Sequence, residues 1–287
     1  NHILPLDKKK LHTIGVIGPN ADSRKALVGN YEGTSSRYIT VLEGIDDYVG
    51  ENVRVLYSEG CHLYRDRTSN LAMEHDRDSE VRAVCEASDV VIAVVGLDAT
   101  LEGEEGDTGN EYGSGDKPNL NLPGLQPDII RIAKESGKPV IVVLLAGSAM
   151  ALSWEDEHVD AILDGFYPGA QGGAAIAEIL FGGANPEGKL PITFYQTTEE
   201  LPEFTDYAMK GRTYRYMENE ALYPFGYGLS YTTYAYGNLE CVKPFDAQDG
   251  ITLQVTVTNT GDREGTETLQ AVSYTHLRAH ETLANLV

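Results

Sequence analysis

The sequence predicts an α/β domain, with a mainly parallel sheet covered by helices on both faces, followed by the start of a small β-sandwich. Three observations predict this. Apolar runs rich in β-branched residues alternate with helical patterns as far as about residue 190. A stretch rich in Tyr, Pro and Gly with little helical period follows, and polar and apolar residues alternate strictly near residue 250. Strand and helix in alternation are typical of right-handed βαβ units.

Five segments have the length and composition of strands that are buried on both faces. Each is short, rich in Val, Ile or Leu, and ends at Gly, Pro or Asp, which is typical of parallel strands. They are "HTIGVIG" at 12–18, "VRVLY" at 53–57, "VVIAVVGL" at 90–97, "VIVVLLAG" at 140–147 and "AILDGFYPG" at 161–169.

Three helical patterns lie between these strands, at 78–89, 123–136 and 170–183. We expect Asp78 to cap the first of them, with Val81, Val84 and Cys85 as its buried stripe. Gly182 and the glycine after it are expected to end the third, because glycine readily adopts the left-handed conformation that terminates a helix.

The last part of the chain predicts a β-sandwich that stops short. In "GITLQVTVTNTGDREGTETLQ" the threonines at 252, 256 and 258 face one way and Leu253, Val255 and Val257 the other. Only three or four strands fit where such a domain normally needs about seven. We therefore expect a main domain over 1–232 and the start of the sandwich over 233–271.

Residues 272–287 fit neither pattern. "VSYTHLRAHET" resembles the translation of a sequencing adapter read in frame at the end of a contig, which predicts a non-native tail. A genuine strand followed by a short helix is the alternative.

The charge balance excludes some classes of partner. With 44 acidic and 22 basic side chains among 287 residues, the formal net charge is -22, which repels nucleic acid and anionic membranes. No window approaches the roughly 18 apolar residues that a membrane span requires. Three isolated cysteines predict buried thiols rather than a disulfide framework or a zinc site. The chain begins without Met or a signal peptide, as if mid-protein, so the localisation, cytoplasmic or secreted, is left open.

The segment "LEGEEGD" at 101–107 gathers Glu102, Glu104, Glu105 and Asp107 directly after a predicted strand. Ligands of doubly wound sheets bind beyond the carboxyl ends of the strands. Carboxylates close together raise at least one pKa, as a general acid at neutral pH requires. A solvated surface loop is the alternative. A calcium loop is a third interpretation, but the EF-hand spacing is missing.

Other motifs point to structure rather than to chemistry. "GPNAD" at 18–22 lacks the pattern of a phosphate loop and predicts a tight turn capped by Asn20 or Asp22. There is no GxSxG or HExxH motif, and outside the predicted tail at 272–287 no two histidines form a ligand pair at helical spacing. Trp154, the only tryptophan, is interpreted as a packing residue, with stacking on a sugar as the alternative.

Several of these segments together resemble the C-terminal half of a glycoside hydrolase family 3 enzyme. The resemblance covers roughly residues 10–271 in the order of the family. It rests on "VIGPNAD", "LVGNYEG", "TVLEGI", "GLDATLEGEEGD", "LNLPGLQ", "FYPGAQGGAAIAEILFGGANPEGKLPITFY", "MKGRTYRYM" and "LYPFGYGLSYT".

The resemblance implies a division of labour between domains. Enzymes of the family pair an N-terminal (β/α)8 barrel that carries an Asp nucleophile with an α/β sandwich that carries the acid/base Glu. Many add a fibronectin-III-like domain. Retaining glycosidases need two such carboxyl groups about 5 to 5.5 Å apart. This chain resembles the second domain and the start of the third, so we expect it to be inactive without the barrel.

The resemblance also selects a residue. In related sequences the acid/base Glu precedes an Asp by three positions, often followed by Arg, which selects Glu104 with Asp107 in support. Thr108 stands in the place of that Arg and leaves the local salt bridge in doubt, so Glu105 and then Glu102 remain fallback candidates.

The implied substrate is a β-linked oligosaccharide or glycoside from which terminal xylose or glucose is removed without a cofactor. "GLDATLEGEEGD" is most similar to the bacterial β-xylosidase type, shared with enzymes that act on β-glucosides and arabinosides. A non-catalytic carbohydrate-binding or scaffold module with the same fold is the alternative.

Overall fold

The computed structural model describes residues 2–103, 117–246 and 250–271. The chain forms two compact units. The first runs to Ala184 and includes Thr193–Tyr223. The second contains Asn185–Ile192 and the chain from Pro224 onward.

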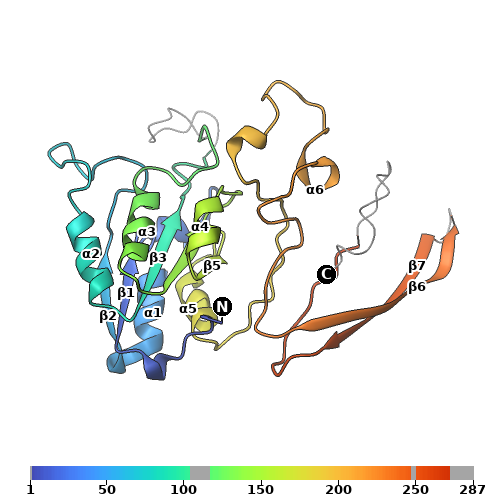
Figure 1. The fold of residues 1–287 in the computed structure, drawn as a ribbon, viewed down its shortest axis with the longest axis horizontal. Coiled ribbons are helices and arrows are strands. Elements are labelled where there is room, and N and C mark those ends of the chain that lie inside the picture. Colours follow the sequence, from blue (N-terminus) through green and yellow to red (C-terminus); the bar gives the residue numbers. More distant parts are fainter. Residues whose placement is uncertain (1, 104–116, 247–249, 272–287) are drawn as a thin grey trace. The chain divides into compact units, whose positions relative to one another are not determined.

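The first unit contains a five-stranded parallel sheet, as the sequence predicts (Figure 1). The strand order is β2-β1-β3-β4-β5, so the chain reverses its direction of travel across the sheet between β1 and β3. The strands are β1 (Thr13–Ile17), β2 (Arg54–Ser58), β3 (Val90–Gly96), β4 (Val140–Leu145) and β5 (Ala161–Asp164). Every residue of β3 and β4 is buried, which explains why their sequences are apolar without alternation.

Helices cover both faces of the sheet (Figure 1). The helices α1 (Val41–Val49) and α5 (Gly172–Leu180) share a core with alternate residues of the strands, among them Ile92 and Val143. On the other face lie α2 (Asp78–Glu86) and α3 (Gln126–Glu135). Shorter elements are α4 (Ser153–His158), α6 (Thr213–Tyr216) and the 3-10 turns Lys8–Lys10, Lys25–Leu27, Gly50–Asn52 and Thr198–Glu200.

Helix α1 was not among the predicted elements, although the sequence carries its start signal. The Thr40 side chain accepts from the Glu43 amide, and the Glu43 carboxylate accepts from the Thr40 amide. This capping box satisfies two amides that the first helical turn leaves without partners.

Two glycines allow α1 and α5 to approach each other closely. A Cβ added at Gly173 would lie 1.9 Å from the Thr40 carbonyl oxygen, and one added at Gly44 would lie 2.1 Å from the Gly173 carbonyl oxygen. Any larger residue would force the helices apart.

The helix ends match the expectations in part. Gly182, at a φ of 76°, follows the end of α5 and donates to the Ile179 carbonyl, so the predicted stop is confirmed. The expected cap at Asp78 is wrong by one position. Asp78 is the first residue of α2, and Arg77 occupies the cap without a side-chain hydrogen bond to the helix, because a guanidinium has no acceptor for a helix amide. The Arg77 guanidinium donates to Glu59 and Glu80 instead.

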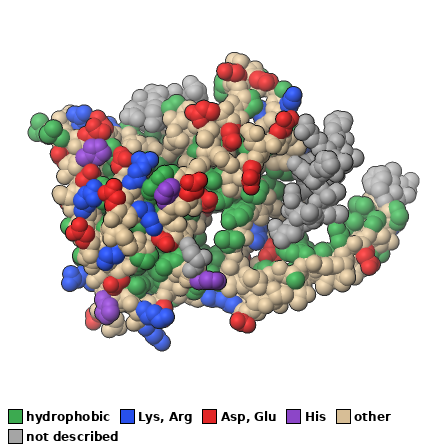
Figure 2. All heavy atoms as spheres, viewed as in Figure 1, with side chains coloured by type: hydrophobic (Ala, Val, Ile, Leu, Met, Phe, Trp, Pro, Cys, Tyr) green, Lys and Arg blue, Asp and Glu red, His purple; other side chains and the backbone are tan. Residues whose placement is uncertain are grey.

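The described part of the second unit contains an antiparallel hairpin of β6 (Tyr234–Asp246) and β7 (Gly250–Asn259). The segment predicted to alternate forms β7, yet its residues Leu253 and Val255 are 51% and 36% exposed. Figure 2 shows hydrophobic side chains on the surface of this hairpin. Cys241 is also exposed, so the expectation of a buried thiol is wrong there, while Cys61 and Cys85 are buried. The sandwich itself remains a prediction, and the predicted tail lies outside the described residues.

Candidate active-site edge

The carboxyl ends of the five strands meet at one edge of the sheet, where doubly wound folds bind their ligands. Polar side chains follow four of these strands: Asn20 after β1, Asp98 and Glu102 after β3, Ser148 after β4, and Asp164 with Tyr167 at β5. The sequence predicts a functional site at this edge, and the structure places several hydrogen-bonding side chains there.

The reversal point between β1 and β3 is filled by the chain itself. Gly18 has a φ of 114°, and a Cβ there would lie 2.1 Å from the Val94 carbonyl oxygen. Asn20 is 1% exposed, and its Nδ2 donates to the Leu97 carbonyl at 2.8 Å. The tight turn predicted for "GPNAD" is present, but Asn20 ties β1 to the end of β3 instead of capping a helix.

The end of β3 is fixed by Gln126, the first residue of α3. Its Oε1 accepts from the Gly96 amide at 2.7 Å, and its Nε2 donates to the Gly96 carbonyl at 2.9 Å and to the Leu63 carbonyl at 2.6 Å. The side chain is fully buried and replaces the partner strand that the last residue of β3 would otherwise need. Gln126 is the last residue of the motif "LNLPGLQ", but the sequence analysis assigns it no role at the end of β3.

A tight turn follows and carries the chain back over the sheet edge. The Asp98 carboxylate accepts from the amide and hydroxyl of Thr100, at 2.9 and 2.5 Å. The Asp98 carbonyl accepts from the amides of Leu101 and Glu102, at 2.9 and 3.1 Å. Leu101 is fully buried, so the turn is anchored by packing as well as by hydrogen bonds.

Glu102 is held by donors from the ends of two other strands. The Gly147 amide donates to its Oε2 at 2.7 Å, and the Tyr167 hydroxyl donates to the same oxygen. The Ser148 hydroxyl donates to Oε1. Both carboxylate oxygens are therefore engaged, and a segment 45 to 65 residues away in sequence fixes the side chain.

The ring of Tyr167 lies against two glycines. A Cβ at Gly147 would lie 2.7 Å from the ring, and one at Gly29 would lie 3.0 Å from it. Burial raises the pKa of Tyr167, and the hydrogen bond to Glu102 acts in the same direction. The phenol thus stays protonated and serves as a donor throughout the physiological range.

Lys117 is the first described residue after the acidic segment. Its Nζ donates to the Asn119 carbonyl at 2.8 Å. Burial lowers the pKa of Lys117, and the negative charge of Glu102 opposes that shift. Lys117 is therefore within electrostatic range of Glu102.

Of the predicted site residues, only Glu102 is described. Glu104, Glu105 and Asp107 lie outside the described residues. Sequence reasoning missed Ser148 and Tyr167. Ser148 directly follows the predicted strand at 140–147, which is a usable signal, whereas Tyr167 lies inside the predicted segment 161–169, because β5 ends earlier, at Asp164.

Asp164 carries a second carboxyl group at this edge, and one of its oxygens is buried. Its Oδ1 accepts from the Phe166 amide at 3.0 Å, whereas its Oδ2 is buried without a hydrogen-bond partner among the described residues. Burial raises the pKa of Asp164 to about 6.

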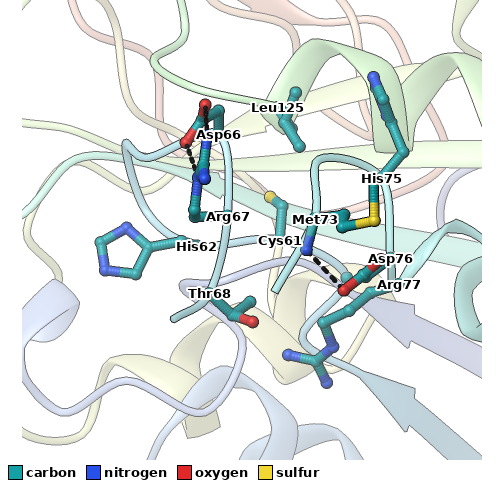
Figure 3. Close-up of a pocket in the computed structure, with 11 residues that line it drawn as sticks. Cys61, His62, Asp66, Arg67, Thr68, Met73, His75, Asp76, Arg77 and Leu125 are labelled. Carbon is teal, nitrogen blue, oxygen red and sulfur yellow. Dashed lines mark hydrogen bonds and ion pairs between the residues drawn. The ribbon is translucent and has the colours of Figure 1, made fainter. Parts of the chain in front are cut away.

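Two hollows lie elsewhere in the first unit. The loop after β2 encloses one of about 10 Å³, which suits one water and no sugar (Figure 3). Asp66 pairs with Arg67 there, Asp76 accepts from the Met73 amide, and burial raises the pKa of the Cys61 thiol to about 12. A groove of about 330 Å³ lies between residues 200–202 and 210–219, but no side chain that lines it is buried.

Trp154 stacks on His158 with ring centroids 4.3 Å apart, and the Arg131 guanidinium lies 5.3 Å from its ring. This agrees with the packing interpretation. Over the described ranges, no group of three His, Cys, Asp or Glu residues is arranged to hold a metal ion. None of the helices within those ranges has the length and apolar character of a membrane span.

Comparison with known proteins agrees with this architecture. The model of the glycosyl hydrolase family 3 C-terminal domain matches residues 1–231. The chain belongs to glycosyl hydrolase family 3. The family match confirms the resemblance on which the sequence prediction rests.

Relatives of this family 3 chain are named as glycosidases. A periplasmic beta-glucosidase of Salmonella typhimurium is 37% identical over 94% of the chain and 38% of the relative. A beta-xylosidase of Formosa agariphila is 34% identical over 94% of the chain and 37% of the relative. A β-glucosidase structure from Erythrobacter marinus gives a TM-score of 0.75 at 32% identity, over 91% of this chain and 37% of that one. The chain thus spans less than half the length of the relatives it matches.

Proposed function

We propose that this chain is the acid/base-bearing part of an exo-acting retaining β-glycosidase that removes terminal β-linked xylose or glucose. Glu104 donates a proton to the leaving oxygen and later deprotonates water, with Asp107 in support. Glu105 is the second candidate for this role. The nucleophile is an Asp on an N-terminal (β/α)8 barrel in the same full-length protein.

The observation that carries this proposal is the anchoring of Glu102. The carboxyl edge of the sheet fixes the start of the acidic segment, and two residues span at most about 7 Å. Glu102, two positions before Glu104 in the sequence, is held against the ends of β4 and β5. Its spacing to Asp107 and the glycosidase names of the relatives support the same assignment.

The hairpin of the second unit supports the rest of the proposed architecture. Its apolar residues are uncovered among the described residues, and a fibronectin-III-like sandwich beginning near residue 233 would cover them with a second sheet. Residues 272–287 are proposed to be a non-native tail.

The test is Glu104→Ala in the protein that joins this chain to its barrel, with Glu105→Ala as the matched control. A general acid contributes about 10²- to 10⁴-fold, so kcat/KM for an alkyl glycoside should fall by that factor. For a dinitrophenyl glycoside, whose leaving group needs no proton, kcat/KM should stay within a few-fold. Azide should raise the kcat of the Glu104→Ala protein, because azide attacks the glycosyl-enzyme in place of the activated water.

Normal hydrolysis of the alkyl glycoside by Glu104→Ala, without azide rescue, would refute the assignment. If the unaltered protein bound oligosaccharides without turnover, a binding or scaffold module would be the correct interpretation instead.

A further inference from the structure

The described residues contain one carboxylate whose surroundings suit a fixed support rather than a proton donor. Glu102 has both oxygens engaged by the Gly147 amide and by the hydroxyls of Ser148 and Tyr167. A general acid must present an oxygen to the substrate, and each of these oxygens already accepts a hydrogen bond.

The three donors are themselves rigidly placed. Gly147 and Ser148 directly follow β4, which is fully buried. The Tyr167 ring packs against Gly29 and Gly147, with no room for a Cβ at Gly147. Because the donors sit on the sheet edge and on a packed ring, they define where the Glu102 carboxylate lies.

The backbone on the other side of Glu102 is fixed as well. Its amide donates to the Asp98 carbonyl, and Gln126 holds Gly96 at the end of β3. Backbone and side chain together therefore set both the position and the direction in which the chain leaves the sheet edge.

From this geometry we infer that Glu102 is a positioning residue for the acid/base carboxyl: its carboxylate, clamped by Gly147, Ser148 and Tyr167, fixes the chain at the carboxyl end of β3, two positions before Glu104 in the sequence. This inference rests on the proposed function of Glu104. A misplacement of about 1 Å far from the bond being broken can cost about 100-fold in rate, so the clamp matters to catalysis without touching the substrate.

The test uses the barrel-bearing protein with Glu102→Gln, Tyr167→Phe and Ser148→Ala. Glu102→Gln places an amide donor among three donors, and Tyr167→Phe keeps the ring while removing one donor. Glu135→Gln, an exposed carboxylate paired with Arg82, is the matched control.

We expect Glu102→Gln to lower kcat/KM for an alkyl glycoside about 10- to 100-fold, since protonation of the leaving oxygen is impaired. For a dinitrophenyl glycoside the change should stay below about threefold. Tyr167→Phe and Ser148→Ala should show the same selectivity at smaller size. Azide should not rescue any of them, because the acid/base carboxyl remains in place.

Equal losses on both glycosides would reduce Glu102 to a general stabiliser of the fold and overturn the inference. Azide rescue of a Glu102→Ala variant would identify Glu102 as the acid/base itself, with the same effect. An unaltered protein without turnover would instead refute the proposed function.

The clamp is also tested independently of turnover. Hydrogen exchange of the Gly147 amide should accelerate at least tenfold in Glu102→Gln and remain unchanged in Glu135→Gln. Unchanged exchange in Glu102→Gln would overturn the clamp whatever the activity.

Discussion

Two acidic side chains at the same sheet edge, Glu102 and Asp164, differ in the number of hydrogen-bond donors that they receive. Glu102 receives three hydrogen-bond donors, whereas Asp164 receives one and keeps an unpartnered oxygen. A buried carboxylate without partners is disfavoured relative to the neutral acid, which is why burial raises the pKa of Asp164.

Asp164 predicts a pH dependence of stability. Its pKa is about 6 in the folded protein against a usual value of 3.8, so folding favours the protonated form. The stability that this proton provides is complete below pH 3.8 and is lost as the pH rises to about 6. The total is about 3 kcal/mol, at 1.36 kcal/mol per pKa unit.

The variant Asp164→Asn cannot ionise, so its free energy of unfolding relative to the original should rise by about 2–3 kcal/mol between pH 4 and pH 7. Urea unfolding at the two pH values measures this difference. A pH-independent difference would contradict the assigned cause.

Among the elements, the contact between α1 and α5 depends on glycine. Gly173→Ala should destabilise the domain by about 2 kcal/mol or more, since the new Cβ would overlap the Thr40 carbonyl. Gly33→Ala is the matched control, because nothing lies within 4 Å of a Cβ there. Chemical denaturation compares the two, and similar effects would show that the helices can separate without cost.

Removing the capping box of α1 should destabilise the domain less than Gly173→Ala does. Thr40→Ala removes one acceptor from the first helical turn, for which we expect a loss of about 1 kcal/mol. Thr40→Ser should retain most of the stability, because the hydroxyl is kept. Thermal unfolding of both variants provides the comparison.

The strands could be predicted from the sequence, and the contacts at their ends could not. Uninterrupted Val and Ile runs indicate burial on both faces, so β3 and β4 lie within the predicted segments. Helix α1 has nine residues, as α2 and α5 do, so its length does not set it apart. Its Thr40 and Glu43 capping box is a start signal that the sequence carries. The pairing of Glu102 with Tyr167 depends on how β3 and β5 are ordered in the sheet, which local sequence does not encode.

At the scale of the whole molecule, the two units differ in how far the described residues cover their strands. The first has a sheet covered on both faces, whereas the described hairpin of the second leaves Ile251 and Leu253 exposed. Exposed apolar strands promote association between copies. Replacing both with Thr should reduce self-association in sedimentation velocity runs without changing the unfolding of the first unit.

The division of catalytic groups between domains gives a further prediction. The proposed nucleophile belongs to the barrel, so the chain by itself should hydrolyse nitrophenyl xyloside no faster than buffer. A release assay for nitrophenol measures this. Turnover that Glu104→Ala abolishes would place a nucleophile within this chain and contradict the proposed division.

The filled reversal point between β1 and β3 has a consequence for inhibitor discovery. In many doubly wound proteins this crevice is the natural entry for nucleotide-like fragments. Here the side-chain amide of Asn20 and the backbone of Gly18 fill this crevice. A fragment screen against the sheet domain should therefore return few hits at that crevice.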